Sequence, residues 1–437
     1  MSTRPPRRAR HLSGVDQLRG FAALLVVTYH VWVLTNYAVL DDGPGRAILG
    51  AGYSGLDLLF IISGFVLFLP AAQNGTIGDG WSYAKRRIAR IAPAYYVVLV
   101  VTLLARPFLD APVGPVAAPG PLNTGEIIPH LFFLQVETPG YVEGGFGVNG
   151  VVWTMSLEAL FYLALPFVAA WYARRPVVGL VGALSVSILW RLAVTNLDVW
   201  LTDATSATVA DLELRLVTQF PTYLFHFALG MTAAWAFTRI APSFARRRSR
   251  GRALALTGVR LGAIGASLVT VGFFMHRLGQ SGLDGTIGPY PQFTLNTLPY
   301  VVGFAGLVLA MSLNTNGALT WWGRAWAWAG KVSYGVYLTH LLVIRFALET
   351  LEFPQDGSGV AFIAMIALTA PVSLGLGWLS FRFIETPARA WARRGGPRRR
   401  QSIRVQPGGQ AAGAALSSAF AAGPRRSGAQ AIVPSEE

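Results

Sequence analysis

Four ionisable side chains lie inside strongly apolar stretches of the chain, where a charged group is costly unless it is paired or faces a wet cavity. They are His30, Asp57, Glu158 and His340. At about 1.5 Å per helical residue, His30 lies roughly 20 Å from the inner surface of a hydrocarbon core about 30 Å thick. The same count puts Glu158 roughly 10 Å from the outer surface, with Asp57 and His340 near that depth. The four therefore indicate one polar site in a shared layer of the membrane.

Three arginines favour an anionic ligand at the cytoplasmic boundary. Arg19 precedes His30 by three helical turns plus about 20°, so the two side chains share one helix face about 16 Å apart. Arg87 and Arg90 are spaced i, i+3 and also share a face. Because guanidinium groups suit phosphate oxygens, the three arginines predict a site for a phosphorylated cytosolic ligand. The neighbouring basic residues leave a second interpretation open, in which the charges only anchor the protein in its orientation.

The composition indicates a membrane protein. Of the 437 residues, 53% are hydrophobic and 13% charged, and the mean hydropathy is +0.46, which leaves too few charges to coat soluble domains. The formal net charge is +15, but the arginines gather at the termini and in short links, so we expect no nucleic-acid partner. The chain has no cysteine, which excludes disulfides, thiolate metal sites and a cysteine acyl-enzyme. We predict no metal and no permanently bound cofactor.

Ten apolar runs of spanning length position the candidate site residues. They lie near 18–37, 47–70, 88–109, 151–173, 177–195, 216–238, 254–275, 294–313, 327–348 and 360–384. The first run lacks a small-residue cleavage site, so we interpret it as a transmembrane helix and not as a removable signal. The predicted fold class is all-α, a polytopic bundle of about ten transmembrane helices that spans the bilayer of the cell membrane.

The distribution of Lys and Arg predicts the orientation and the domain organisation. Basic segments alternate with links rich in Asp and Glu along the chain, and this alternation predicts that both termini are cytoplasmic. We expect a basic cytoplasmic arm at 1–14, a membrane domain at 15–390 and a disordered basic cytoplasmic tail at 391–437. The link 110–150 is long and apolar, and we expect a short helix or re-entrant segment within it.

Six short blocks resemble the integral-membrane acyltransferase-3 family, which includes O-acetylases of bacterial glycans and acylases of macrolide antibiotics. In chain order they are Arg19 with His30 in the Arg-x10-His spacing, 55–65 (GLDLLFIISGF), 87–95 (RIARIAPAY), 153–158 (WTMSLE), 333–340 (SYGVYLTH) and 385–387 (ETP). The blocks follow the family's order across residues 18–387. Leu56 and Leu59 depart slightly from the family, in which Val or Phe is commoner, and the middle spans are too variable to compare.

The resemblance implies a ten-span acyltransferase that takes an acyl group, acetyl in the simplest case, from cytosolic acyl-CoA. The acceptor would be a hydroxyl of a glycan, a glycolipid or a glycosylated metabolite. The family's roles carry over to His30 as the catalytic histidine and to Arg19, Arg87 and Arg90 on the donor side. Neither the acceptor nor the oligomeric state follows from these blocks.

The chemistry of such a transfer assigns further roles. An imidazole that takes the proton of the attacking hydroxyl accelerates the reaction roughly 10²–10⁴-fold, and we predict that His30 is this base. A carboxylate would fix its tautomer and stabilise the imidazolium; Glu158 and Asp57 both have a suitable depth, and the choice stays open. The expected cavity-lining residues are Ser63, Trp153, Tyr334, Tyr337 and His340. A covalent intermediate on Ser63 or Ser156 ranks below direct transfer.

Two other classes of protein fit part of the pattern. A transporter or flippase of a glycolipid or small polar substrate would also have about ten spans and intramembrane carboxylates. The sequence shows no internal repeat of the kind common in transporters. A receptor or scaffold without chemistry would leave the shared layer of ionisable groups unexplained.

Overall fold

The computed structural model describes residues 12–35, 44–109, 124–137, 148–201, 206–244, 250–278, 297–313 and 320–394. Within these ranges the regular secondary structure is helical and includes no β-strand. Seven of the described helices are long and apolar enough to cross a membrane. The predicted fold class, an all-α polytopic membrane protein, is therefore confirmed.

A helix lies at each of the ten places where the sequence predicts a span. These helices are α1 (Ser13–Leu34), α3 (Ser54–Asn74), α4 (Gly80–Ala105), α6 (Trp153–Arg174), α7 (Pro176–Val194), α10 (Phe220–Phe244), α11 (Arg250–Leu278), α12 (Leu298–Leu313), α13 (Trp321–Thr350) and α14 (Gly359–Ser380). The apolar helix α12 is shorter than the seven spanning candidates, and α10 and α13 are not among them.

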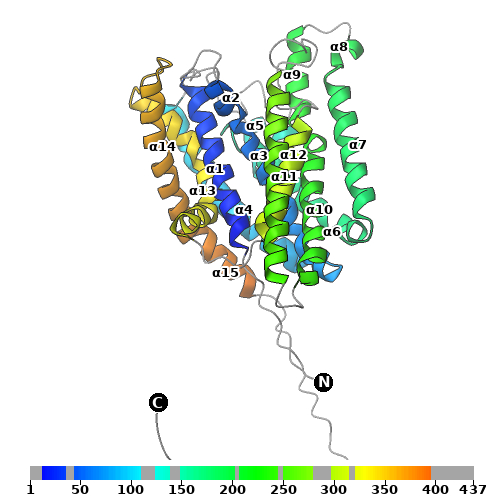
Figure 1. Ribbon diagram of the computed structural model, residues 1–437. Helices are drawn as coiled ribbons and strands as arrows, with labels where there is room; N and C mark the ends of the chain where they lie inside the picture. Colours follow the sequence, from blue (N-terminus) through cyan, green and yellow to red (C-terminus); the bar gives the residue numbers. More distant parts are fainter. Residues whose placement is uncertain are drawn as a thin grey trace, which may run out of the picture. The chain divides into compact units, whose positions relative to one another are not determined.

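The long helices run in alternating directions through the bundle, so α1 begins and α14 ends at the same end of it (Figure 1). We call this end, where α15 (Thr386–Arg394) also lies, the N-terminal end. The short helices α2 (Pro44–Gly50), α8 (Leu197–Trp200) and α9 (Ser206–Val217) lie at the opposite end. The arrangement agrees with an even number of crossings, whereas the cytoplasmic location of the N-terminal end remains a prediction.

The predicted short helix in the link 110–150 is present as α5 (Thr124–Leu131). Two tyrosines of α4 hold it: the Tyr95 hydroxyl donates to the His130 carbonyl oxygen at 2.9 Å, and the Tyr96 hydroxyl donates to the Leu131 carbonyl oxygen at 2.6 Å. The end of α5 therefore packs against the C-terminal half of α4.

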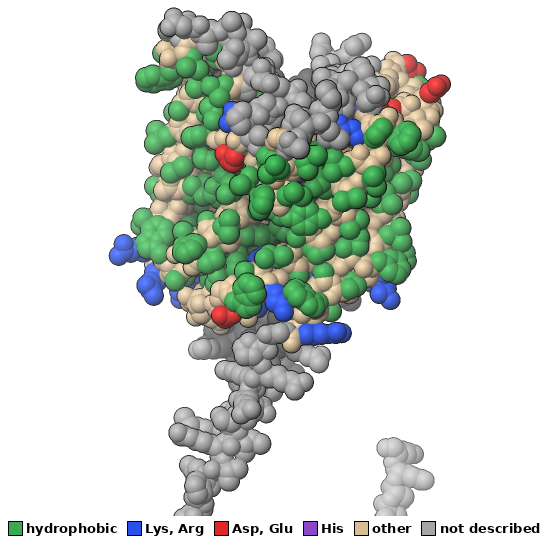
Figure 2. Space-filling view, turned by 180° about the vertical axis from the view of Figure 1, so that it is seen from behind, with side chains coloured by type: hydrophobic (Ala, Val, Ile, Leu, Met, Phe, Trp, Pro, Cys, Tyr) green, Lys and Arg blue, Asp and Glu red, His purple; other side chains and the backbone are tan. Residues whose placement is uncertain are grey.

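The outer face of the bundle suits a bilayer. Figure 2 shows hydrophobic side chains across the middle of one face, with most Lys and Arg side chains near the N-terminal end. Large apolar side chains such as Leu104, Phe167 and Val360 are exposed on spanning helices. In water such a surface would be unfavourable, and in lipid it needs no further cover.

Side-chain caps begin three of the long helices. The Asp79 carboxylate accepts a hydrogen bond from the Ser82 amide at 2.7 Å at the start of α4, and this bond lowers the pKa of Asp79. Thr320 caps α13 and Ser358 caps α14 in the same way. Two of these helices, α4 and α13, carry candidate site residues, so the caps help to fix where those residues lie.

Two glycines let α1 and α13 pack closely. A Cβ atom at Gly330 would overlap the carbonyl oxygen of Asp16, and one at Gly20 would lie 2.8 Å from the Gly330 amide nitrogen. Small residues at such a crossing allow backbones to approach, which is a main source of helix association in membranes. The crossing holds His30 on α1 beside His340 on α13.

Replacing Gly330 should separate these two helices. We expect Gly330→Ala to destabilise the folded protein by about 1–3 kcal/mol, because the added methyl group has no room at the crossing. Gly375→Ala is the matched control, since a Cβ atom there meets nothing within 4 Å. Thermal unfolding in detergent should show a lower Tm for Gly330→Ala only, and equal Tm values would refute the close-packing argument.

Two predicted domain boundaries fall near the ends of the described ranges. Residues 13 and 14, assigned to the basic arm, already belong to α1, and α15 continues the helical part to Arg394, past the boundary predicted at 390. Residues 1–11 and 395–437, where most of the arm and the tail are predicted, lie outside the described residues.

Candidate functional site

A pocket opens between α1, α3, α4, α6 and α13, with an open volume of about 710 Å³ that includes solvent at its mouth. Its lining combines charged and hydroxyl side chains with apolar ones from α3. Seven of the residues singled out in the sequence lie in this lining: Arg19, Ser63, Arg87, Arg90, Glu158, Tyr334 and Tyr337. The structure thus brings the predicted donor-side arginines to one cavity with a predicted catalytic carboxylate.

The arginines give the pocket a positive side. The Arg19 guanidinium lies 3.5 Å from the Asp16 carboxylate, and it is repelled by Arg90 and attracted by Glu158. The Arg87 guanidinium lies over the ring of Tyr83, and its buried Nε has no hydrogen-bond partner among the described residues. An arrangement with more guanidinium groups than carboxylates is suited to bind a multiply charged anion.

Glu158 belongs to the arginine side of the pocket. Its carboxylate accepts a hydrogen bond from the Tyr162 hydroxyl at 2.9 Å, one turn further along α6. Tyr162 lines the same pocket. The role predicted for Glu158, as orienting carboxylate of His30, therefore stays a prediction, while the contacts observed are with Tyr162 and the arginine charges.

His30 contacts a second histidine. Its Nδ1 lies 3.2 Å from Nε2 of His340 and 3.0 Å from the Val26 carbonyl oxygen, and the two ring centroids are 5.0 Å apart. His340 is fully buried, and its Nδ1 lies 2.7 Å from the Tyr337 carbonyl oxygen. The sequence placed both histidines at one depth but did not pair them.

Tyr337 connects the histidine pair to the pocket. Its side chain lines the pocket, and its ring centroid lies 5.7 Å from that of His340. The Tyr337 hydroxyl donates to the Val151 carbonyl oxygen at 3.0 Å and accepts from the Thr154 hydroxyl at 3.0 Å. The histidines thus lie directly behind one wall of the cavity.

Of the other residues singled out for the cavity or for a covalent intermediate, some line the pocket and others do not. Tyr334 lines the pocket and donates to the Ile91 carbonyl oxygen at 2.7 Å. Ser63 lines the pocket, whereas Ser156 is fully buried and is not part of the lining. Trp153 packs its ring 5.9 Å from that of Tyr223 and is also not part of the lining.

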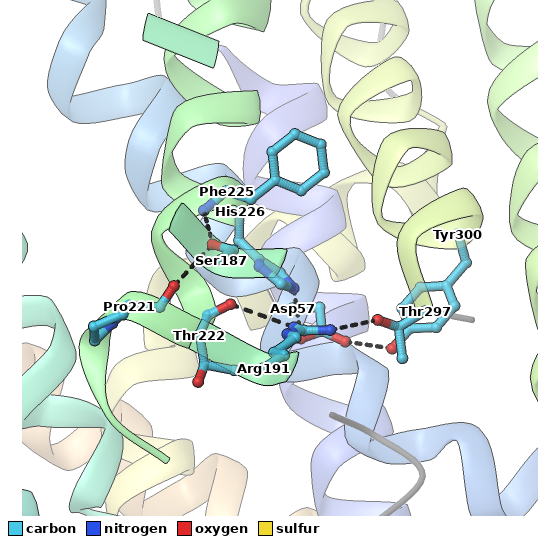
Figure 3. A network of polar contacts seen from close by, with 9 residues as sticks. All are labelled: Asp57, Ser187, Arg191, Pro221, Thr222, Phe225, His226, Thr297 and Tyr300. Carbon is cyan, nitrogen blue, oxygen red and sulfur yellow. Dashed lines mark hydrogen bonds and ion pairs between the residues drawn. The ribbon is translucent and has the colours of Figure 1, made fainter. Parts of the chain in front are cut away.

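Asp57 lies in a different polar cluster from the one predicted for it (Figure 3). Its carboxylate accepts a hydrogen bond from the Tyr300 hydroxyl at 2.8 Å and lies 3.1 Å from Nε2 of His226. Arg191 attracts it electrostatically, donating its own hydrogen bonds to Thr297 and to the Thr222 carbonyl oxygen. Asp57, one of the two carboxylates that the sequence left open as the partner of His30, thus faces α7, α10 and α12.

Sequence reasoning missed this cluster, although a signal for it existed. Arg191 and His226 are ionisable residues inside two predicted spans, 177–195 and 216–238, and each is at most 3% exposed. The depth argument applied to the other buried groups would have placed them near Asp57. Tyr300 carried no such signal, because a tyrosine near the end of a span is commonly an interfacial residue.

A helical membrane bundle with an arginine-lined pocket beside a histidine pair fits the acyl transfer that the sequence blocks imply. The chain belongs to the acyltransferase-3 family: the family model described as an acyltransferase domain matches residues 12–382. The predicted resemblance is therefore confirmed, and with it the prediction of an acyltransferase. Membership favours acyl transfer over the transporter or flippase alternative.

Several curated relatives are similar over most of the chain. O-acetyltransferase OatA of Staphylococcus aureus (strain NCTC 8325 / PS 47) is 24% identical over 391 residues, which are 87% of this chain and 57% of the relative. Peptidoglycan O-acetyltransferase OatA of Listeria monocytogenes is 22% identical over 401 residues, 87% of this chain and 56% of the relative. The putative peptidoglycan O-acetyltransferase YrhL of Bacillus subtilis (strain 168) is 25% identical, with coverages of 87% and 55%.

The chain thus spans a little over half the length of these relatives. No solved structure matches it.

Proposed function

We propose that this protein is an O-acyltransferase of the cell membrane that moves an acetyl group from cytosolic acetyl-CoA to a hydroxyl of a glycan. A glycolipid or a glycosylated metabolite has the same acceptor chemistry, and the names of the relatives favour a peptidoglycan-type glycan. The observation that carries the proposal is one pocket with Arg19, Arg87 and Arg90 in its lining and Tyr337 in another wall, with the ring of His340 5.7 Å from that of Tyr337.

The layout of the pocket suits an elongated anionic donor. The phosphates of CoA would lie on the arginines, whose guanidinium groups match phosphate oxygens in geometry and charge. The eleven helical steps from Arg19 to His30 correspond to about 16 Å along α1, so the thioester at the end of an extended pantetheine arm would approach the histidine layer.

The transfer itself needs one proton acceptor. As the acceptor oxygen attacks the thioester carbonyl carbon, His30 takes the hydroxyl proton, and the carbon–sulfur bond breaks to release CoA thiolate. The imidazolium of His30 then returns the proton to the thiolate, which leaves an O-acetyl ester, CoA thiol and neutral His30.

The donor-side arginines can be tested one at a time. Arg87→Ala and Arg90→Ala should each raise the KM for acetyl-CoA about 10–100-fold, the value of a hydrogen bond to a charged group, with little change in the acceptor KM. Because the contacts are charge-assisted and partly wet, the deficit should vary with salt.

Arg86→Ala is the matched control, because Arg86 belongs to the same basic run but is exposed and does not line the pocket. If all three variants behaved alike, the run would be a topological anchor only.

The proposed function is tested with purified protein in lipid nanodiscs, given acetyl-CoA and soluble peptidoglycan oligosaccharides. We expect mass spectrometry to find acetylated oligosaccharide and an equal amount of free CoA. Protein that leaves both acetyl-CoA and the oligosaccharides unchanged would count against the donor. Release of CoA without acetylated oligosaccharide would support the donor and count against this acceptor.

A further inference from the structure

The contacts of His340 determine which of its ring nitrogens carries a proton. Its Nδ1 lies 2.7 Å from the Tyr337 carbonyl oxygen and 3.2 Å from that of Val336. Carbonyl oxygens only accept hydrogen bonds, so Nδ1 must be the protonated nitrogen. In neutral His340 the other nitrogen, Nε2, then presents a lone pair toward His30.

The contacts of His30 lead to the matching assignment. Its Nδ1 lies 3.0 Å from the Val26 carbonyl oxygen and 3.2 Å from Nε2 of His340. Both neighbours are acceptors, so Nδ1 of His30 carries the proton and donates. The remaining nitrogen of neutral His30, Nε2, therefore has the free lone pair that a general base needs.

We propose that His340 is the positioning residue of His30, in the place where a carboxylate was expected. His340 accepts the Nδ1 proton of His30, which holds the imidazole in the tautomer with Nε2 available, and its lone pair stabilises the imidazolium formed during transfer. This role rests on the proposed function, in which His30 is the base. The proposal states which ring nitrogen donates the hydrogen bond between the two histidines, so it can be tested without measuring catalysis.

The surroundings explain why an imidazole suits this position better than a carboxylate. His340 is 0% exposed, and an unpaired charge buried there would be strongly unfavourable. A neutral imidazole can accept a hydrogen bond on one nitrogen while the helix backbone satisfies the other. The Gly20 and Gly330 crossing then fixes the separation of the two rings.

Two substitutions of His340 test the roles of its two ring nitrogens separately. Gln places an amide oxygen near the position of Nε2, where it can accept from His30, whereas the amide of Asn reaches only the position of Nδ1. We expect His340→Asn to lower kcat about 10–100-fold, the value of a hydrogen bond to a charged group, with little change in either KM. His340→Gln should recover most of that loss.

Thr339→Val is the matched control, since Thr339 is a buried neighbour on α13 whose hydroxyl, within the described part of the chain, bonds only the Gly335 carbonyl oxygen. It should keep the wild-type kcat. In a His30→Ala background His340→Asn should cost nothing further, because a residue that acts through His30 has no partner left. Equal losses for the Gln and Asn variants, or additive losses with His30→Ala, would overturn the proposal.

Nitrogen-15 NMR of histidine-labelled wild-type protein tests the same claim without substrate. The signals of the pair are assigned by their loss in His30→Asn and in His340→Asn. We expect both rings to be protonated at Nδ1 and bare at Nε2. A proton on Nε2 of His340 would reverse the hydrogen bond and overturn the proposal, whether or not the protein transfers acetyl groups. Absence of transfer with the expected NMR signature would instead refute the proposed function and leave the pair intact.

Discussion

His30→Ala should lower kcat for acetyl transfer roughly 10²–10⁴-fold, the usual contribution of a general base, while the protein still inserts and folds. The loss is chemical, because alanine is favourable in a helix and the hydroxyl proton then has no acceptor. The donor KM should change little, since the pocket's arginines remain in place. Single-turnover measurement with acetyl-CoA separates binding from chemistry and checks both statements.

A matched control for His30→Ala is Thr28, two residues earlier on the same helix. Among the described residues the Thr28 hydroxyl bonds only the Leu24 carbonyl oxygen, so Thr28→Ala should keep the wild-type kcat and a similar Tm. Wild-type turnover in His30→Ala would remove His30 from the mechanism. An equal loss in Thr28→Ala would show that packing of α1, and not the imidazole, limits the rate.

Asp57→Ala should destabilise the folded protein by about 3–5 kcal/mol, because it removes a buried carboxylate that attracts the buried Arg191 guanidinium. Asp57 is 5% exposed and Arg191 is 3% exposed, so water cannot replace the lost partner. The variant also removes the acceptor for Tyr300 and His226. Thermal unfolding in detergent should show a correspondingly lower Tm.

Two further variants make the test of the Asp57 cluster specific. The double variant Asp57→Ala with Arg191→Met should be more stable than Asp57→Ala alone, since it also removes the buried positive charge that Asp57 attracts. Glu352→Gln, which neutralises an exposed carboxylate in a link, should leave the Tm nearly unchanged. If Asp57→Asn instead kept the wild-type Tm and lost turnover, the predicted catalytic role of Asp57 would be favoured over a structural one.

Hydrophobic run length was sufficient to predict the helices. A run of about twenty apolar residues has few options other than a membrane helix, because lipid offers the backbone no hydrogen-bond partners. The apolar link 110–150 likewise predicted the helix found at α5. Helix boundaries were not predictable from hydrophobicity where polar residues continue a helix. In α15, for example, the basic residues resembled the start of the tail.

The candidate site was predictable in part for a physical reason. Depth along a helix follows from counting residues, so His30 and His340 were placed in one layer, and their contact agrees with that. Depth does not determine which way a side chain points around the bundle. Asp57 therefore lay at a plausible depth but faces α7, α10 and α12, and only the packing of α3 against α10 reveals it.

The measurement that tests the central claim most directly uses sealed proteoliposomes with the protein in one known orientation. Acetyl-CoA labelled in the acetyl group is supplied on one side at a time, with the oligosaccharide acceptor on both sides. The account predicts labelled acceptor only when acetyl-CoA is on the side of the N-terminal end, where the arginine pocket receives it. Labelling that is equal from both sides, or absent from both, would contradict the account.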